Sequence, residues 1–175
     1  MNLETVRMAV RGFDQPADRK SRELVEQLLD WSAEPFSRHQ FAPGHITCTG
    51  LVVDAVSGSI LLVQHRRLQR WLLPGGHVEL EDESIADAAR REVLEETGIA
   101  CDEEWWELAG IDVHGIPSNG REPYHLHHDL VIRLRPVTTE LVVSPEAKAA
   151  VWCPAGDIGR YSLPVRVVQM ATRRE

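Results

Sequence analysis

The sequence has few cysteines and no long hydrophobic run. Cys48, Cys101 and Cys153 are odd in number, widely spaced and without a Cys-x-x-Cys pair, so they indicate reduced thiols rather than a disulfide framework. No apolar stretch approaches the roughly 18 residues that a membrane-spanning helix needs. The N-terminal residues are interrupted by Glu4 and Arg7 and lack the apolar core of a signal peptide. We therefore expect a cytoplasmic protein with no membrane partner.

Basic residues are scarce in one acidic segment, residues 79–107. Its 29 residues hold 12 of the 27 Asp and Glu residues, and its only bases are Arg90 and Arg91. The formal net charge of −8 therefore belongs to this segment. DNA, RNA and anionic lipid need arrays of Lys or Arg, so we expect no nucleic-acid polymer as a partner. A small phosphorylated ligand is compatible with the segment if cations lie between the two.

Periodicity and turn residues predict strands on both sides of a central helix. The 175 residues, 43% of them hydrophobic, suffice for one domain with a buried core. Residues 1–16 show no clear period. The pattern predicts a helix at 17–31, a β-hairpin of 45–56 with 60–64, a strand at 71–73, a helix at 84–98, strands at 105–116 and 124–135, a helical turn at 145–150, a strand at 151–152 and a helix at 163–173. This order favours an α/β fold of the α+β type with a mixed sheet between helices.

The chain is predicted to divide into an N-terminal helical extension, residues 1–43, and a main domain, residues 44–175. The apolar stripe of the first predicted helix consists of Leu24, Leu28 and Trp31. Such a helix either pairs two subunits into a homodimer or caps the sheet. The sequence leaves both interpretations open.

Three glutamates crowd one side of the central helix. Ser84 and Gly98 are placed to be its N-cap and its left-handed C-cap. Glu92, Glu95 and Glu96 stand at i, i+3 and i+4, which places them on one side of the helix. On this feature alone a solvated charged face is the more ordinary interpretation. The neighbouring residues favour a functional one.

The segment from Gly76 to Ile99 resembles the Nudix box of the Nudix hydrolase superfamily. That box is a Gly, a spacer, a Glu, seven residues, Arg-Glu, an aliphatic residue, any residue, Glu-Glu, any residue, Gly and an aliphatic residue. Its typed positions are occupied here by Gly76, Glu83, Arg91, Glu92, Val93, Glu95, Glu96, Gly98 and Ile99. The preceding Leu72-Leu73-Pro74-Gly75-Gly76 is similar to the lead-in of the same family. One departure is the spacer before Glu83, which has six residues where the family pattern has five.

The resemblance implies a Nudix-like α/β/α sandwich and a Mg²⁺-dependent hydrolase, with Mn²⁺ as a substitute. Such an enzyme cleaves a diphosphate linkage in a nucleoside diphosphate derivative or a related small pyrophosphate. Mg²⁺ prefers carboxylate, water and phosphate oxygens, which a helix with several carboxylates can offer. Carried over residue by residue, the metal ligands are Glu92 and Glu96, with Glu95 sharing and Glu83 helping through water or a second metal. Arg91 is expected to orient these glutamates through charge-assisted hydrogen bonds.

The general base is less defined by the sequence. Glu146 lies in a Ser-Pro-Glu turn six residues before Trp152, a placement similar to that of a later acidic residue in some family members. The alternative is an ordinary glutamate at the start of a helix. We hypothesise that Glu146 contributes to catalysis together with Glu92, Glu95 and Arg91.

Polar residues on two predicted strands are candidates for substrate contact. His125, His127 and Asp129 alternate along one face of a strand, and Asp112 and His114 do so on the strand before it. These groups bind the non-phosphate part or the phosphates of the substrate, hold a separate transition metal, or form an exposed polar face, and the sequence leaves the three alternatives open. Further candidates for substrate binding are Gly75, Gly76, Trp71, Arg66 and His45.

Two other functions stay open beside hydrolysis of a small diphosphate substrate. A non-catalytic nucleotide-sensing Nudix module is expected to lose the acids of the box, which are present here. A prenyl-diphosphate isomerase shares the fold but needs a reactive cysteine. Cys48 and Cys101 lack the expected context for that role.

Overall fold

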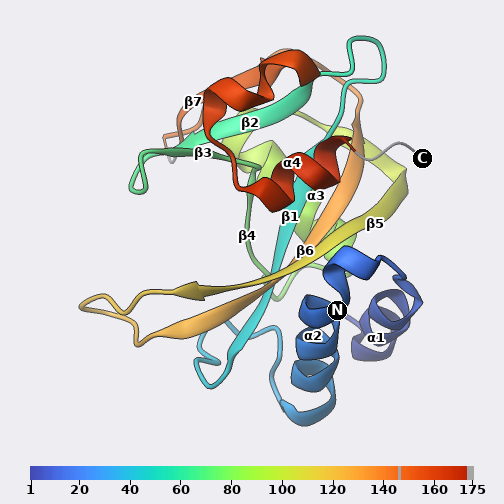
Figure 1. Cartoon of the computed structure of the whole chain (residues 1–175), viewed down its shortest axis with the longest axis vertical. Helices are drawn as coiled ribbons and strands as arrows, with labels where there is room; N and C mark the ends of the chain where they lie inside the picture. Colours follow the sequence, from blue (N-terminus) through green and yellow to red (C-terminus); the bar gives the residue numbers. More distant parts are fainter. Residues whose placement is uncertain (146, 173–175) are drawn as a thin grey trace.

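The computed structural model describes residues 1–145 and 147–172, which form helices and two β-sheets (Figure 1). The elements in chain order are α1 (Leu3–Gly12), the 3₁₀ helix η1 (Pro16–Asp18), α2 (Arg19–Trp31), β1 (Gly44–Val52), β2 (Ile60–His65), β3 (Arg70–Leu72), β4 (Gly75–His77), α3 (Ile85–Thr97), β5 (Cys101–Ile116), β6 (His125–Pro136), β7 (Ala147–Cys153), the 3₁₀ helix η2 (Ala155–Tyr161) and α4 (Val165–Thr172). None of the described helices combines the length and hydrophobicity that crossing a bilayer requires. The three cysteines are free.

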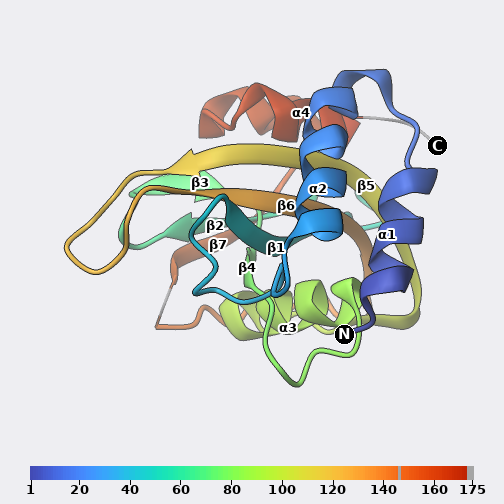
Figure 2. The same cartoon turned by 90° about the horizontal axis from the view of Figure 1, so that it is seen from below.

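The larger sheet is mixed and has the strand order β4-β1-β6-β5. β1 runs parallel to β6, whereas β4 and β5 run antiparallel to their neighbours. The smaller sheet, β3-β2-β7, is antiparallel. α3 lies on one side of the larger sheet and α4 on the other (Figure 2). This arrangement confirms the predicted α+β fold with a mixed sheet between helices.

The core lies on both faces of the larger sheet because successive side chains of a strand point to opposite faces. On one face, Ile46 and Leu130 belong to a buried cluster with Val93 of α3. On the other face, Leu51 packs in a second cluster with Met170 of α4. Each fully buried aliphatic side chain contributes roughly 1.5–3 kcal/mol to stability. The first cluster holds α3 against the sheet, and the second holds α4 against its other face.

The ends of α3 are fixed as the sequence predicts. The Ser84 side chain accepts a hydrogen bond from the backbone N–H of Asp87 at 3.2 Å. Gly98 ends the helix with a φ of 70°, in the left-handed region that glycine adopts without steric cost. These caps fix the two ends of the helix that carries the glutamates.

The predicted hairpin of residues 45–56 with 60–64 is wrong. β1 belongs to the larger sheet and β2 to the smaller one, and a single bridge, Val53 with Ile60, links the two segments. Both segments are apolar and β-branched because they are buried on both faces. Such a composition identifies a strand without identifying its partner.

The N-terminal extension holds one helix more than the sequence indicated. α1 was missed, although Asn2 caps it by accepting from Glu4 and Thr5 N–H groups. In α2, Leu28 is buried as predicted, but Leu24 and Trp31 are 41% and 82% exposed. The buried stripe instead combines Leu28 with Val25 and Leu29.

Both N-terminal helices pack in the same core cluster as α3, and α2 contacts β5. This packing is compatible with the second of the two interpretations left open by the sequence, in which the extension caps the sheet. The homodimer and the division into residues 1–43 and 44–175 stay predictions. The predicted helical turn at 145–150 is wrong for residues 147–150, because they lie in β7.

Candidate functional site

The carboxylates of α3 meet the short glycine strand β4. The Gly75 N–H donates a hydrogen bond of 3.1 Å to Glu96 Oε2. A Cβ added to Gly76 would lie 2.6 Å from Glu92 Oε1, so only glycine lets the carboxylate come this close. Glu96 is 9% exposed, Glu92 is half-buried and Glu95 is exposed. The three acids therefore form a graded series from the interior to solvent.

Arg91 links the glutamates of α3 to β4 through hydrogen bonds. Its Nη1 donates to Glu92 Oε1 at 2.9 Å and to Glu95 Oε2 at 3.2 Å. Its Nη2 donates to the backbone oxygen of His77 in β4 at 2.8 Å. Burial alone would lower the pKa of Arg91, but the hydrogen bonds that it donates to Asp82 and Glu92 raise this pKa above its ordinary value. Arg91 is therefore charged and contacts the acids, as predicted for a residue that orients them.

The local electrostatics favour a bound cation. Burial raises the pKa of Glu92, the neighbouring Arg91 opposes the shift, and the negative charge of Glu95 adds to it. A positive ion would stabilise the ionised form of Glu92. An all-oxygen donor set with a partly exposed edge fits a hard cation such as Mg²⁺. The assignment of Glu92, Glu95 and Glu96 as ligands stays a prediction.

Asp82 is a site residue that the sequence analysis missed. It is 5% exposed and binds Arg91 in a two-pronged pair, with Nε to Oδ1 at 3.1 Å and Nη2 to Oδ2 at 3.0 Å. The next residue, Glu83, is exposed and lines a hollow beside α1. The signal was present in the sequence, because a spacer of five residues after Gly76 is followed directly by Asp82. The helping role predicted for Glu83 stays a prediction.

The opposite face of β4 and β1 is polar. Thr47 and Thr49 each donate a hydrogen bond of 2.9 Å to Asp129 Oδ1. Burial raises the pKa of Asp129 to about 6, although the two threonine hydroxyls oppose the shift. Across the sheet, β5 pairs with β6 so that Asp112 lies opposite Asp129 and His114 opposite His127. The pairing brings together the residues that the sequence placed on two adjacent strand faces.

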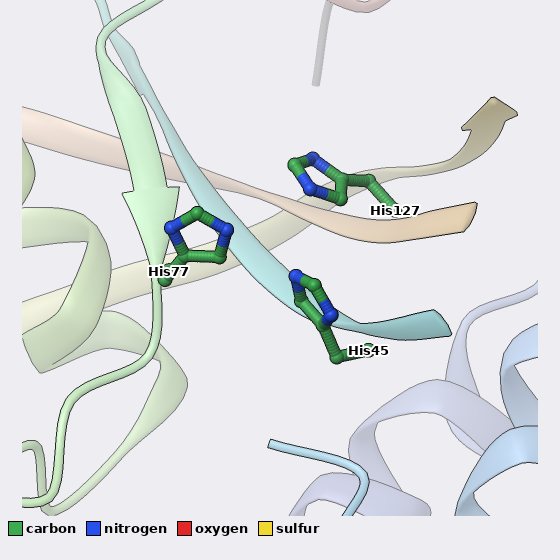
Figure 3. Close-up of side chains that lie close together, drawn as sticks. All are labelled: His45, His77 and His127. Atoms are coloured by element: carbon green, nitrogen blue, oxygen red, sulfur yellow. The ribbon is translucent and has the colours of Figure 1, made fainter. Parts of the chain in front are cut away.

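Three imidazoles form a separate cluster on this polar face, which we call the histidine cluster: His45 of β1, His77 of β4 and His127 of β6. Figure 3 shows their rings turned toward one another from three adjacent strands. One ring nitrogen from each lies within 4.8 Å of the others. Burial and the neighbouring histidines lower the pKa of His77 to about 4 and that of His127 to about 2. His77 had not been singled out, because strand register is not readable from its sequence context.

The remaining histidines of this face lie beside the cluster. His125 is buried, its Nδ1 is 2.9 Å from the Pro123 backbone oxygen, and its ring stacks on His45 at 5.1 Å between centroids. His114 Nδ1 lies 3.0 Å from Asp112 Oδ2, and this hydrogen bond raises its pKa. Contact of these groups with substrate stays a prediction.

Two further substrate candidates lie near the smaller sheet, Trp71 in β3 and Arg66 in the turn after β2, and one catalytic candidate is not described. The Trp71 ring packs edge-on against Tyr161 at 5.1 Å. Arg66 donates to the backbone oxygen of Ala147 at 3.3 Å. The first contact joins β3 to η2, and the second joins the turn after β2 to β7. Glu146 lies outside the described residues.

Comparison with known proteins identifies the family and the fold. The NUDIX domain model matches residues 44–170. The chain is 33% identical over 89 residues to the m7GpppN-mRNA hydrolase NUDT17 of Danio rerio, covering 48% of this chain and 29% of that protein. It is 36% identical over 85 residues to nucleoside diphosphate-linked moiety X motif 6 of Xenopus laevis, covering 47% and 37%. The chain thus spans about a third of the length of these relatives.

A solved structure extends the likeness over most of the chain. The crystal structure of the MutT protein from Bacillus halodurans superposes with a TM-score of 0.57 and 26% sequence identity. The match covers 73% of this chain and 80% of that one.

Proposed function

Because the chain belongs to the NUDIX domain family, we propose that it is a Mg²⁺-dependent hydrolase of a diphosphate linkage. The substrate is a nucleoside diphosphate derivative or a related small organic pyrophosphate, and Mn²⁺ is the expected substitute metal. One observation carries this proposal: the carboxylates of Glu92 and Glu96 lie against the glycine strand β4, and Arg91 donates a hydrogen bond to Glu92.

Each part of this region has a role in the proposed reaction. When bound, Mg²⁺ neutralises charge on the diphosphate and lowers the pKa of a bound water. Glu92 and Glu96 hold the cation, and Glu95 shares it from the exposed side. Arg91 keeps the glutamate side chains in place. Gly75 and Gly76 present backbone without side chains, which lets the diphosphate approach.

The general base is proposed to include Glu146. General-base losses are typically 100-fold or more. Glu146→Gln is therefore expected to lower kcat by about that factor. A kcat within about threefold of the wild type would remove Glu146 from the mechanism.

The substrate class is the finer part of the proposal. One relative is named for hydrolysis of capped mRNA. In this chain, the acidic segment at residues 79–107 argues for a small substrate instead. The test is a chromatographic assay of the phosphorylated products formed from ADP-ribose, dNTPs, NADH, dinucleoside polyphosphates, sugar nucleotides, CoA, a cap dinucleotide and capped RNA, each with Mg²⁺ or Mn²⁺. We expect turnover of at least one small substrate and a requirement for the cation.

Two variants make the assay specific for the proposed site. Glu92→Gln is expected to abolish most of the turnover, whereas Glu103→Gln, an exposed acid beyond the helix, is the matched control and keeps it. Tight binding of one compound without turnover would favour the nucleotide-sensing alternative. Conversion of an isoprenoid diphosphate into an isomer that keeps its diphosphate would favour the isomerase.

A further inference from the structure

We propose that the histidine cluster, His45, His77 and His127, is a site for a divalent transition metal of the Zn²⁺ type, separate from the carboxylates of α3. The proposal does not rest on the hydrolase activity. The sequence also raised a transition-metal site as one alternative for the polar strand residues. Only His127 belongs both to that set of residues and to the histidine cluster.

The backbone pairing brings these three side chains to one place. In the parallel pairing of β1 with β6, His45 lies opposite His127. In the antiparallel pairing of β1 with β4, His77 lies opposite Thr47, two residues along from His45 on the same face. The ring centroids of His45 lie 5.0 Å from His77 and 4.9 Å from His127. Three rigid, adjacent strands therefore hold the imidazoles.

The distances between the three ring nitrogens are close to those between nitrogen ligands of a bound metal. Zn–N bonds of about 2.0–2.1 Å in a tetrahedron place the nitrogens about 3.3 Å apart. The three donor atoms already lie within 4.8 Å of one another. Rotations of the side chains that move each nitrogen by about 1 Å close the site without moving a strand. Three protein ligands leave the fourth position open for water or another donor.

The two ring nitrogens of His45 are arranged as in a metal ligand, with one nitrogen hydrogen-bonded to the backbone and the other left for a metal. Its Nδ1 lies 3.1 Å from the backbone oxygen of Gln40, and this bond assigns the proton to Nδ1. Its Nε2 is buried and has no hydrogen-bond partner among the described residues. An unsatisfied buried nitrogen is costly, and a metal would satisfy it.

The chemistry of the donors separates this site from the one on α3. Imidazole nitrogens suit Zn²⁺, Cu²⁺, Ni²⁺ and Fe²⁺, whereas carboxylate and water suit Mg²⁺. The neighbouring carboxylate, Asp129, has one oxygen engaged by Thr47 and Thr49. His77 and His127 are only half-buried, which gives a metal ion a path from solvent. We therefore expect Zn²⁺ to prefer the histidine cluster and Mg²⁺ the glutamates.

The test is Zn²⁺ binding to the full chain, purified without a histidine tag, stripped with a chelator and held in excess Mg²⁺. Calorimetry and elemental analysis should give one Zn²⁺ per chain with a Kd below about 1 µM. His127→Ala and His77→Ala should each weaken binding at least about 100-fold, because they remove a direct ligand. His65→Ala, which removes a histidine from the smaller sheet, and Glu92→Gln should bind as the wild type does.

Two measurements keep the result interpretable if a variant folds poorly. Circular dichroism establishes that each variant is folded, and Zn²⁺ should raise the Tm of the wild type but not that of His127→Ala. Co²⁺ should give the visible spectrum of a low-coordinate site in the wild type. No Zn²⁺ uptake by the wild type, equal uptake by folded His77→Ala and His127→Ala, or loss of uptake in Glu92→Gln would overturn the proposal. A protein that binds Zn²⁺ but hydrolyses nothing would leave this site intact and refute the proposed function.

Discussion

The two faces of the edge strand β4 carry opposite chemistry. On one face, Gly76 leaves room for the Glu92 carboxylate, and the donors are all oxygen. On the other face, the His77 ring joins His45 and His127, and the donors are all nitrogen. The carbonyl of the same His77 accepts a hydrogen bond from Arg91. A three-residue strand can therefore separate an all-oxygen donor set, proposed here for a hard cation, from an all-nitrogen donor set, proposed for a borderline one.

The strongest test of the difference between the two faces is to remove one carboxylate oxygen from the oxygen face. Glu96→Gln is expected to lower kcat about 1,000-fold, because a catalytic cation supplies several kcal/mol of transition-state stabilisation. Its Zn²⁺ affinity should stay within about twofold of the wild type, since no ligand of the histidine cluster changes. Steady-state hydrolysis and Zn²⁺ titration of the same sample test both halves. A parallel loss of hydrolysis and of Zn²⁺ binding would mean that the two faces form one site.

The second test concerns the neighbouring acids Asp82 and Glu83. Asp82→Asn breaks the two-pronged pair with Arg91 and is expected to lower the free energy of unfolding by about 2–3 kcal/mol, somewhat less than for a fully buried pair because Arg91 keeps some solvent contact. Glu83→Gln is the matched variant, and we expect a change within about 0.5 kcal/mol, since its side chain is exposed. Urea unfolding measures both. Equal changes in the free energy of unfolding would mean that the Asp82–Arg91 pair does not stabilise the fold.

The third test compares the two glycines of β4. An alanine Cβ at Gly75 would lie 2.8 Å from the Cys48 backbone oxygen, so Gly75→Ala should cost about 1–3 kcal/mol of stability. At Gly76 the Cβ would meet the end of the Glu92 side chain, which can move. Gly76→Ala should therefore lower kcat/KM about 10-fold or more, through the displaced carboxylate, with a smaller loss of stability. Thermal melts and steady-state kinetics of the two variants measure both effects. A larger loss of stability in Gly76→Ala and a larger loss of kcat/KM in Gly75→Ala would contradict the geometry.

The smallest expected effect is a pH dependence of stability that originates in the histidine cluster. The pKa of His77 is lowered to about 4 and that of His127 to about 2, both from 6.5, so the unfolded chain binds more protons between pH 6.5 and 4. Stability should therefore fall as the pH drops through this window.

Asp129 acts in the opposite direction within the same window. Its pKa is raised to about 6, so protonation of its carboxyl group favours the folded state as the pH falls. His127→Gln should flatten the loss of stability on acidification, and Asp129→Asn should steepen it. Urea unfolding at pH 7 and pH 5 measures these slopes. A wild-type protein that gains stability on acidification would contradict the assignment to the histidines.

The two faces also differ in how far the sequence predicts them. Glu92, Glu95 and Glu96 lie within one helix whose period and caps are local properties, so their common side was predictable. The histidine cluster depends on the register of three strands, which tertiary pairing decides. The same limit explains the wrong hairpin, because β1 and β2 each have the composition of a buried strand but pair with distant partners.

Asp82 shows a different limit. Its spacing from Gly76 was visible, but burial of one of two adjacent acids depends on the path of the loop. Similarly, Leu24 and Trp31 fit a helical stripe, yet the core lies on the side of Val25 and Leu29. A periodic pattern indicates a helix more reliably than it indicates which side is buried.

The parallel pairing of β1 with β6 has a consequence for synthesis and folding. The Thr47–Asp129 hydrogen bond joins residues 82 positions apart, and His45 meets His127 through the same pairing. Contacts of such sequence separation form late, because a long loop must close first. On the ribosome, a chain that has emerged only as far as α3 already contains every box glutamate but lacks β6. The helix with its acids can thus exist before the central sheet does, whereas the histidine cluster appears only after β6 has been translated.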